Sequence, residues 1–242
     1  MRPTSGVGLT AVNKADLKAH RATIANIQDQ IYSPLYDSGV YTSASTTSLQ
    51  FFTVPRGQGT TSAIGATGTK NYADTNLQLA GQLALGNRFY CTGIEFQIFP
   101  MVSASPTVQL NPARGTAAES ATVAGQYVNT IALLSQTAYI QFTIQNRDYL
   151  IDANLLNFPP VNRLAGFSSQ TDASTAGGTS QYSEISYASV AGAAYNIVPV
   201  YIEPTQAFSL TAFWPSAVTL PTGVAAARIF CRLRGRLIRN AQ

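Results

Sequence analysis

From Tyr32 to the end of the chain, apolar and polar residues alternate in short runs that are separated by Gly, Ser, Thr and Pro. A period of two residues is typical of a β-strand with one buried and one exposed face. The clearest runs cover residues 48–54, 88–99, 138–144, 197–202, 208–214 and 226–238, and weaker ones cover 40–43, 77–85, 127–134 and 149–156. Pro199 lies inside one run and predicts an edge strand or a bulge there, because proline has no N–H to donate. The chain therefore offers about eight to ten strands.

The residues before Tyr32 follow a different pattern. Over residues 14–31 the apolar side chains are spaced by seven, three and four positions, which predicts an amphipathic helix. Its apolar stripe consists of Leu17, Ile24, Ile27 and Ile31. Asn13 is expected to cap the start of the helix, and Pro34 lies just beyond its end. A stripe this narrow is expected to dock on the body of the protein or on a neighbouring subunit, behind a flexible arm formed by residues 1–13.

The fold class follows from the absence of helical patterns between the predicted strands. Such a chain forms antiparallel sheets rather than βαβ units. Polar connections at 56–75, 103–125 and 168–190 are too long for tight hairpins and are typical of the extended loops of a jelly roll. We therefore predict an all-β protein with an N-terminal arm plus helix over 1–31 and an antiparallel jelly-roll sandwich over 32–242. The number of strands favours a single roll, with a compact double roll as the alternative.

The composition adds an indication of assembly. Charged residues make up 11% of the chain, against roughly 25% in ordinary soluble domains. A subunit whose surface is covered by neighbours needs fewer charges than a dispersed monomer, although neutral polar side chains can also keep a monomer soluble. Basic residues gather near both ends, and residues 225–242 contain five arginines and no acid. This distribution predicts contact with a polyanion or with acidic neighbours.

The side chains that an active site needs are scarce. The single histidine, His20, lies in the predicted helix, so neither a zinc site nor a Ser-His-Asp triad can be assembled in the β-rich region. Asp148 and Asp152 would lie about 13 Å apart in a regular strand, which is too far for a glycosidase pair. Cys91 and Cys231 fit buried free thiols. We predict no enzymatic activity, no catalytic residues, no metal and no cofactor.

The last predicted strand carries the clearest candidate for an interaction surface. Its apolar residues Ile229, Cys231, Leu233 and Leu237 share one face. Arginines repeat on the other face about every 6.6 Å, and one more follows near the chain end. The candidate contact residues are Arg232, Arg234, Arg236 and Arg239. Such guanidinium groups suit phosphate or carboxylate, so the row is a nucleic-acid contact, a salt-bridge surface toward a neighbouring subunit, or a solvated face. The lack of aromatic residues between the arginines counts against specific nucleic-acid recognition.

The order and character of these segments resemble the jelly-roll coat proteins of small tailless icosahedral bacteriophages. The resemblance covers about residues 30–242. It rests on IYSPLYDSGVYT followed by LQFFTVPRGQG, and on NLQLAGQLALGNRFYCTGIEFQIFP, YIQFTIQNRDYLIDANLLNFPP, IEPTQAFSLTAFWP and RGRLIRNAQ. It implies a major capsid protein that forms capsomers and then a closed shell, with basic terminal segments facing the interior. The chain is shorter than the usual double-roll coats, which leaves a single-roll relative and a minor shell component open.

The predicted function is that of a structural virion protein that self-assembles into an icosahedral capsid enclosing the viral genome, in the host cytoplasm. Its predicted partners are copies of itself, other capsid proteins and genomic nucleic acid bound without sequence specificity, and no small-molecule substrate is expected. Tyr32, Tyr36 and Tyr41 belong either to the core or to a contact zone between subunits. The alternative is a phage decoration or fibre protein or a carbohydrate-binding β-sandwich module, which would need a patch of aromatic residues on its loops.

Overall fold

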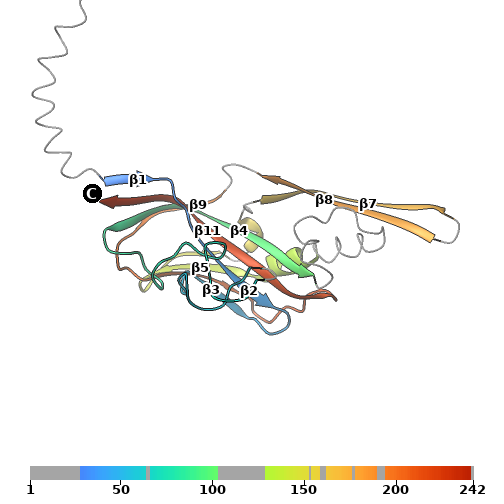
Figure 1. Ribbon diagram of the computed structural model, residues 1–242, viewed down its shortest axis with the longest axis horizontal. Helices are drawn as coiled ribbons and strands as arrows, with labels where there is room; N and C mark the ends of the chain where they lie inside the picture. Colours follow the sequence, from blue (N-terminus) through green and yellow to red (C-terminus); the bar gives the residue numbers. More distant parts are fainter. Residues whose placement is uncertain are drawn as a thin grey trace, which may run out of the picture.

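The computed structural model describes residues 28–63, 66–102, 129–152, 154–158, 162–175, 178–189 and 194–240. They form a mostly β structure in which two antiparallel sheets lie against each other as in a sandwich, with a separate two-stranded hairpin (Figure 1). The alternating pattern thus produces the expected β architecture, and a mostly β chain with antiparallel sheets is confirmed over the described residues.

The larger sheet has five strands and is organised around the long β11 (Val224–Asn240). Along one side β11 pairs with β4 (Asn87–Val102), which in turn pairs with the edge strand β9 (Tyr195–Ile202). Along its other side β11 pairs with β1 (Gln28–Ile31) and then with β2 (Leu35–Thr42). β1 and β2 share one continuous register against β11, from Gln28↔Asn240 to Thr42↔Ala226, and are separated at Pro34, which has no N–H for the ladder.

The smaller sheet has four strands in the order β3, β10, β5, β6. Their bounds are Ser48–Phe51, Phe208–Phe213, Tyr139–Ile144 and Arg147–Asp152. β10 is the centre, because it pairs with β3 on one side and with β5 on the other. β3 ends where Phe52 adopts a positive φ of 67°.

The core fills the space between the two sheets. Ile140, Phe142 and Leu210 of the smaller sheet are fully buried, as are Ile94 and Ile229 of the larger one. Aromatic rings connect the two layers, as in the pair Phe51–Phe96 at 5.9 Å and the pair Tyr41–Trp214 at 4.7 Å. Each fully buried side chain of this size stabilises the fold by about 1.5–3 kcal/mol. Cys91 and Cys231 belong to this core as free thiols, as predicted, and burial raises the pKa of Cys91 to about 12.

The clearest predicted strands are all confirmed, as β3, β4, β5, β9, β10 and β11. Pro199 lies in the edge strand β9, next to a register shift in its pairing with β4, as its presence predicted. Among the weaker predictions, 40–43 falls within β2 and 149–156 is strand only to Asp152, after which the 3-10 turn η2 (Leu155–Asn157) follows. Residues 77–85 form only isolated bridges instead of the predicted strand.

The prediction of a strand over residues 127–134 is wrong, because residues 129–137 are helical. Burial there recurs at Thr130, Leu134, Ser135 and Ala138, a spacing close to a helical turn. The helix is fixed to the smaller sheet by its backbone as well, because Trp214 Nε1 donates to the carbonyl oxygen of Leu134 at 3.1 Å. The short apolar run Ile131–Leu134 fits either period, and only tertiary packing decides between them.

The predicted helix over 14–31 cannot extend to its expected end. Residues 28–31 form β1, and Ile31 pairs with Leu237 of β11. The three-and-four spacing that includes Ile31 therefore does not reflect a helical stripe there, because hydrogen bonds to the chain's other end favour the extended conformation. Leu17, Ile24 and Ile27 lie outside the described residues, as does the polar connection at 103–125.

The prediction of an extended connection over residues 168–190 is wrong, because this segment is part of a β-hairpin. Its strands β7 (Asn162–Thr175) and β8 (Gly178–Ser189) pair with each other over their whole length. This hairpin is inserted between β6 and β9 and joins neither sheet; Figure 1 shows it extending away from the sandwich. In the connection at 56–75, in contrast, the residues that the structure describes (56–63 and 66–75) form no strand, as predicted.

Candidate interaction surfaces

The arginines of β11 lie on the outer face of the five-stranded sheet. Ile229, Cys231 and Leu233 are fully buried on the inner face, so Arg232, Arg234 and Arg236 point the other way. The predicted separation of the two faces of the last strand is therefore confirmed. Arg239, beyond them, pairs across the sheet edge with Asp29 of β1.

Among the described residues, ion pairs with a carboxylate are seen for Arg232 and Arg239. Arg232 Nη1 lies 3.6 Å from Glu95 Oε2, and Arg239 Nη2 lies 2.9 Å from Asp29 Oδ2. Burial raises the pKa of Glu95 above its ordinary value, and the charges of Arg232 and Arg234 oppose this rise. The Nε of Arg232 is buried and has no hydrogen-bond partner. Arg232 therefore serves first to neutralise Glu95, while the exposed Arg236 has its guanidinium in contact with solvent.

A second polar cluster holds the connection between β3 and β4 against the sheet. The carboxylate of Asp74 accepts hydrogen bonds from Thr61 Oγ1 at 2.6 Å and from the backbone N–H of Ser62 at 2.9 Å. Arg228 of β11 lies 3.4 Å from the same carboxylate and also donates to the carbonyl oxygen of Ala73. Burial alone would raise the pKa of Asp74, but the hydrogen bonds from Thr61 and from backbone groups lower it below its ordinary value.

A buried ion pair anchors the same connection on the inner side of β2. Lys70 Nζ lies 2.7 Å from Asp37 Oδ1, with side-chain exposures of only 9% and 1%. The other oxygen of Asp37 accepts the backbone N–H of Phe52, the residue with positive φ at the end of β3. Burial raises the pKa of Asp37 even though the charge of Lys70 opposes the shift. The charges of Lys70, Asp37, Asp74 and Arg228 are thus compensated by one another. This is typical of a structural network rather than a reaction centre.

The connection also covers the open edge of β2. The backbone N–H of Tyr36 donates to Asn76 Oδ1 at 3.0 Å, and the N–H of Asn76 donates back to the carbonyl oxygen of Tyr36 at 3.3 Å. Asn76 Nδ2 in addition donates to the carbonyl oxygen of Pro34. An edge strand covered in this way cannot pair with another chain. The sequence did not indicate the polar network of Asp37, Thr61, Lys70, Asp74 and Arg228, because these residues come from four separate segments with no characteristic spacing.

The opposite edges of the two sheets carry exposed apolar side chains. Because β2 contacts β3, the other edge strands, β9 and β6, lie on one side of the sandwich. The ring of Tyr195, in β9, lies 4.4 Å from the ring of Phe158, in the segment that follows β6. Val198 of β9 is 88% exposed and Ile151 of β6 is 66% exposed. We call Tyr149, Ile151 and Val198 the edge cluster.

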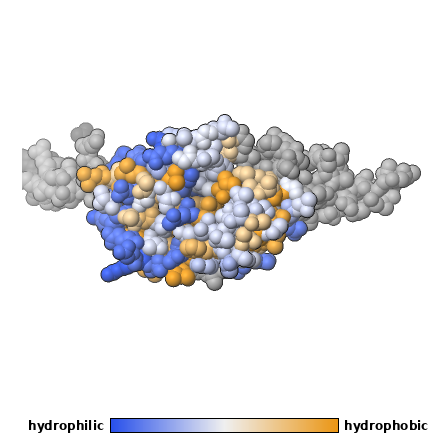
Figure 2. Space-filling view, turned by 90° about the horizontal axis from the view of Figure 1, so that it is seen from below, coloured by the Kyte–Doolittle hydropathy of each residue, from blue (hydrophilic) through white to orange (hydrophobic). Residues whose placement is uncertain are grey.

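One face of the sandwich is weakly hydrophilic over much of its area (Figure 2). Seen from the side on which β2 and β3 lie in Figure 1, strongly hydrophilic residues gather mainly toward one end, and pale or orange residues cover most of the rest (Figure 2).

Of the three tyrosines near the first strand, Tyr41 is in the core and Tyr32 is exposed. Tyr36 stacks on Phe230 of β11 with ring centroids 5.5 Å apart.

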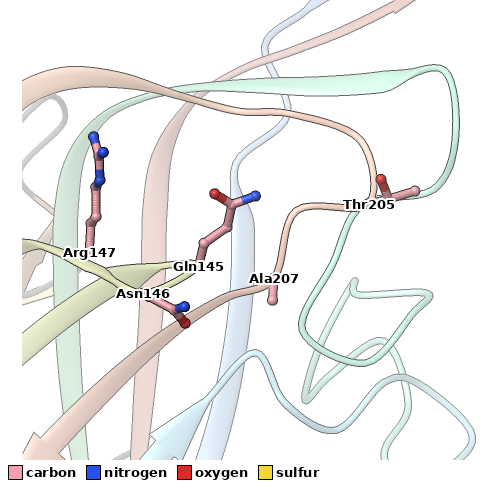
Figure 3. Close-up of a pocket in the computed structure, with 5 residues that line it drawn as sticks. All are labelled: Gln145, Asn146, Arg147, Thr205 and Ala207. Atoms are coloured by element: carbon pink, nitrogen blue, oxygen red, sulfur yellow. The ribbon is translucent and has the colours of Figure 1, made fainter.

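A shallow hollow of about 590 Å³ lies at the turn between β5 and β6. It is lined by Gln145, Asn146, Arg147, Thr205 and Ala207. Figure 3 shows Gln145 and Arg147 on one side of the turn and Asn146 on the other, with Thr205 and Ala207 on the segment opposite. Gln145 and Thr205 have positive φ values of 55° and 63°. None of these five lining residues is aromatic, so the hollow lacks the aromatic patch expected of a binding module.

No group of His, Cys, Asp and Glu side chains suited to a metal ion occurs among the described residues. Nor does any helix in the part of the chain that the structure describes have the length and apolar character to cross a membrane. Comparisons of the chain with protein-family models, with curated proteins and with solved structures find no match.

Proposed function

We propose that this chain is a coat subunit that self-assembles into an icosahedral virus shell and encloses the genome. The order of the strands is the observation that carries the proposal. β1 continues the register of β2, and β7 and β8 are an insertion, which leaves eight strands: β2, β3, β4, β5, β6, β9, β10 and β11. The first of these pairs with the last, the second with the seventh, the third with the sixth and the fourth with the fifth.

This nested pairing supports a single jelly roll. A long hairpin of eight strands, rolled up on itself, pairs its strands in this way and splits them into two facing sheets of four. Such rolls occur in viral capsid proteins, in lectin domains and in cupins. A cupin needs a cluster of histidines for its metal, whereas this chain has a single histidine, His20. The choice is then between a coat protein and a binding module.

The edge cluster favours a coat protein. An open strand edge with exposed apolar side chains is a site for association with another protein surface. Burying Val198 and Ile151 in a contact with a second copy would stabilise that contact by about 1.5–3 kcal/mol per side chain. The low charge of the chain, 11% of residues, agrees with a surface that neighbours cover.

The inserted hairpin supports the same function. A two-stranded ribbon is at best marginally stable by itself in water. β7 and β8 join neither sheet of their own chain, and they leave the sandwich between β6 and β9, the strands of the edge cluster. In a shell, a neighbouring subunit would cover the ribbon. Docking by Leu17, Ile24 and Ile27 stays a prediction, with any helix ending before Gln28.

The test is the assembly state of the full chain, measured by light scattering after size exclusion and by electron microscopy. Regular particles or capsomers are expected. Ile151→Asp and Val198→Asp are expected to abolish them, because each places a charge in the contact. Leu85→Asp is the matched control, since Leu85 is 87% exposed but lies outside the edge cluster. A wild-type chain that stays monomeric at high concentration, or a control as damaging as the two edge variants, would contradict the proposal.

A further inference from the structure

Four side chains form a row across the outer face of the five-stranded sheet. Arg236 of β11 pairs with Tyr90 of β4, and Tyr90 pairs with Tyr201 of β9. On the other side of β11, Ile31 pairs with Leu237 and Leu35 pairs with Leu233, so the shared register places Tyr32 opposite Arg236. The row therefore reads Tyr32, Arg236, Tyr90, Tyr201, with one residue from each of four neighbouring chain segments. With a strand spacing of about 4.8 Å it spans about 14 Å.

The row faces solvent. Its neighbours on β4 and β9 that point inward, Phe89 and Ile202, are fully buried, while Tyr32 is 60% exposed and Tyr201 is 48% exposed. The rings of Tyr90 and Tyr201 lie 4.8 Å apart and form one aromatic platform. The Arg88 guanidinium lies 5.6 Å from the centre of the Tyr201 ring, and Arg88 Nε is 2.6 Å from Glu203 Oε2.

We propose that this tyrosine–arginine row binds single-stranded nucleic acid without sequence preference. Aromatic rings next to cationic side chains are the common elements of single-strand binding surfaces: bases stack on the rings and phosphates contact the cations. Tyr90 and Tyr201 provide the stacking platform and Arg236 the phosphate contact, with Tyr32 as a second stacking position on the far side of Arg236. The aromatic residues that the sequence of β11 lacks are thus supplied by the strands beside it.

A carboxylate surface on a second copy fits this row less well. The chain has 11 acidic residues, and five of them, Asp29, Asp37, Asp74, Glu95 and Glu203, already form ion pairs within the chain. These five carboxylates are therefore less available to a second copy. A carboxylate can accept a hydrogen bond from a tyrosine O–H but does not stack on the ring, whereas every base has a face that can stack.

The test is fluorescence anisotropy of the full chain with a labelled oligothymidylate of about 15 nucleotides, a length that matches common single-strand sites. Tyr201→Ala is expected to weaken binding roughly 5- to 150-fold, since stacking contributes about 1–3 kcal/mol per base, and to leave the salt dependence unchanged. Tyr201→Phe keeps the ring and should bind like the wild type. Arg236→Gln is expected to reduce the slope of log K against log salt by about 0.7, the value for one phosphate contact on a single strand.

The controls come from outside the row and outside the edge cluster. Tyr72 is 64% exposed and Arg147 is likewise exposed, so Tyr72→Ala and Arg147→Gln should bind like the wild type. Ile151→Asp is expected to block assembly and to leave oligonucleotide binding intact, which separates a failure of this inference from a failure of the proposed function. Equal losses in the control variants, an unchanged affinity of Tyr201→Ala, or equally tight binding of a polyglutamate peptide would overturn the inference.

Discussion

Removal of the Lys70 charge is expected to destabilise the fold strongly. Lys70 and Asp37 form an ion pair of 2.7 Å with side-chain exposures of 9% and 1%. Lys70→Met keeps most of the aliphatic volume but leaves the carboxylate of Asp37 buried without its countercharge. Breaking a buried pair in this way costs about 3–5 kcal/mol, a large part of a typical free energy of unfolding of about 5–15 kcal/mol. For a chain of this size, the melting temperature should fall by roughly 6–20 °C.

The expected effect on pH dependence has a defined sign. Burial raises the pKa of Asp37 in spite of Lys70, so the folded state holds its proton more tightly than the unfolded state. The stability gained from this proton is fully present below the ordinary pKa of an aspartate and is lost as the pH rises through the folded pKa. Lys70→Met removes the opposing charge and raises that pKa further. The difference in stability between wild type and variant should therefore grow as the pH rises above about 4.

The assay is urea unfolding followed by the fluorescence of Trp214, the single tryptophan, which is 2% exposed in the core. Arg239→Met is the control, because its pair with Asp29 is about half exposed and should contribute at most about 1 kcal/mol. In the double variant Lys70→Met with Asp37→Asn, the amide oxygen can still accept the N–H of Phe52, so part of the stability should return. A loss below about 1 kcal/mol in Lys70→Met, or no recovery in the double variant, would refute this reasoning.

Three further predictions concern the hairpin, the sheet and the thiols. Replacement of residues 162–189 by a short Gly–Ser linker should leave the unfolding of the sandwich unchanged but abolish particles in electron microscopy, whereas intact particles would show that the hairpin makes no essential contact. Gly235→Ala should destabilise the fold by about 1–3 kcal/mol or more in the same urea assay, because the new Cβ would meet the carbonyl oxygen of Tyr90; wild-type stability would contradict this close approach. Cys91 and Cys231 should not react with a thiol reagent at pH 8 until the protein unfolds, since burial raises the pKa of both; rapid reaction of the folded protein would count against their burial.

The strands could be predicted because the alternation of apolar and polar residues within each strand reflects its buried and its exposed face. In β5, for example, Ile140, Phe142 and Ile144 are buried and the residues between them are not, and this alternation is local. The wrong assignments occur where the deciding partner is distant. β1 is extended because it pairs with the last residues of β11. The helix at 129–137 is held by a distant residue as well, because Trp214 donates a hydrogen bond to Leu134. Local spacing near Ile31 fits a helix, and only the distant partner overrides it.

The same distinction applies to the candidate surfaces. Alternation along β11 was sufficient to place Arg232, Arg234 and Arg236 on one outer face. It could not reveal that Glu95 lies beside Arg232 or that Tyr90 lies beside Arg236, because both depend on the register between β11 and β4, which includes a bulge next to Gly235. Register is set by the whole sheet, and no spacing within one strand encodes it.

A shell subunit that binds nucleic acid through one sheet has to turn that sheet toward the interior. The tyrosine–arginine row lies on the outer face of the five-stranded sheet, and the edge cluster lies to the side, where β6 and β9 end the two sheets. The edge cluster would then make the lateral contacts and leave the four-stranded sheet to face outward. In the middle of that sheet's outer face, the exposed Gln50 and the half-buried Gln141 and Thr143 are polar and uncharged. Ile151 of the edge cluster lies on the same face, opposite Gln141 on the edge strand β6, where a lateral contact would bury it. In assembled particles a cysteine at Gln50 should therefore react with a bulky maleimide, and one at the exposed Gln30, next to the row, should not. If the cysteine at position 30 reacted and the one at position 50 did not, the tyrosine–arginine row would lie on the outside of the particle. Nucleic acid binding by the row would then not take place inside a shell.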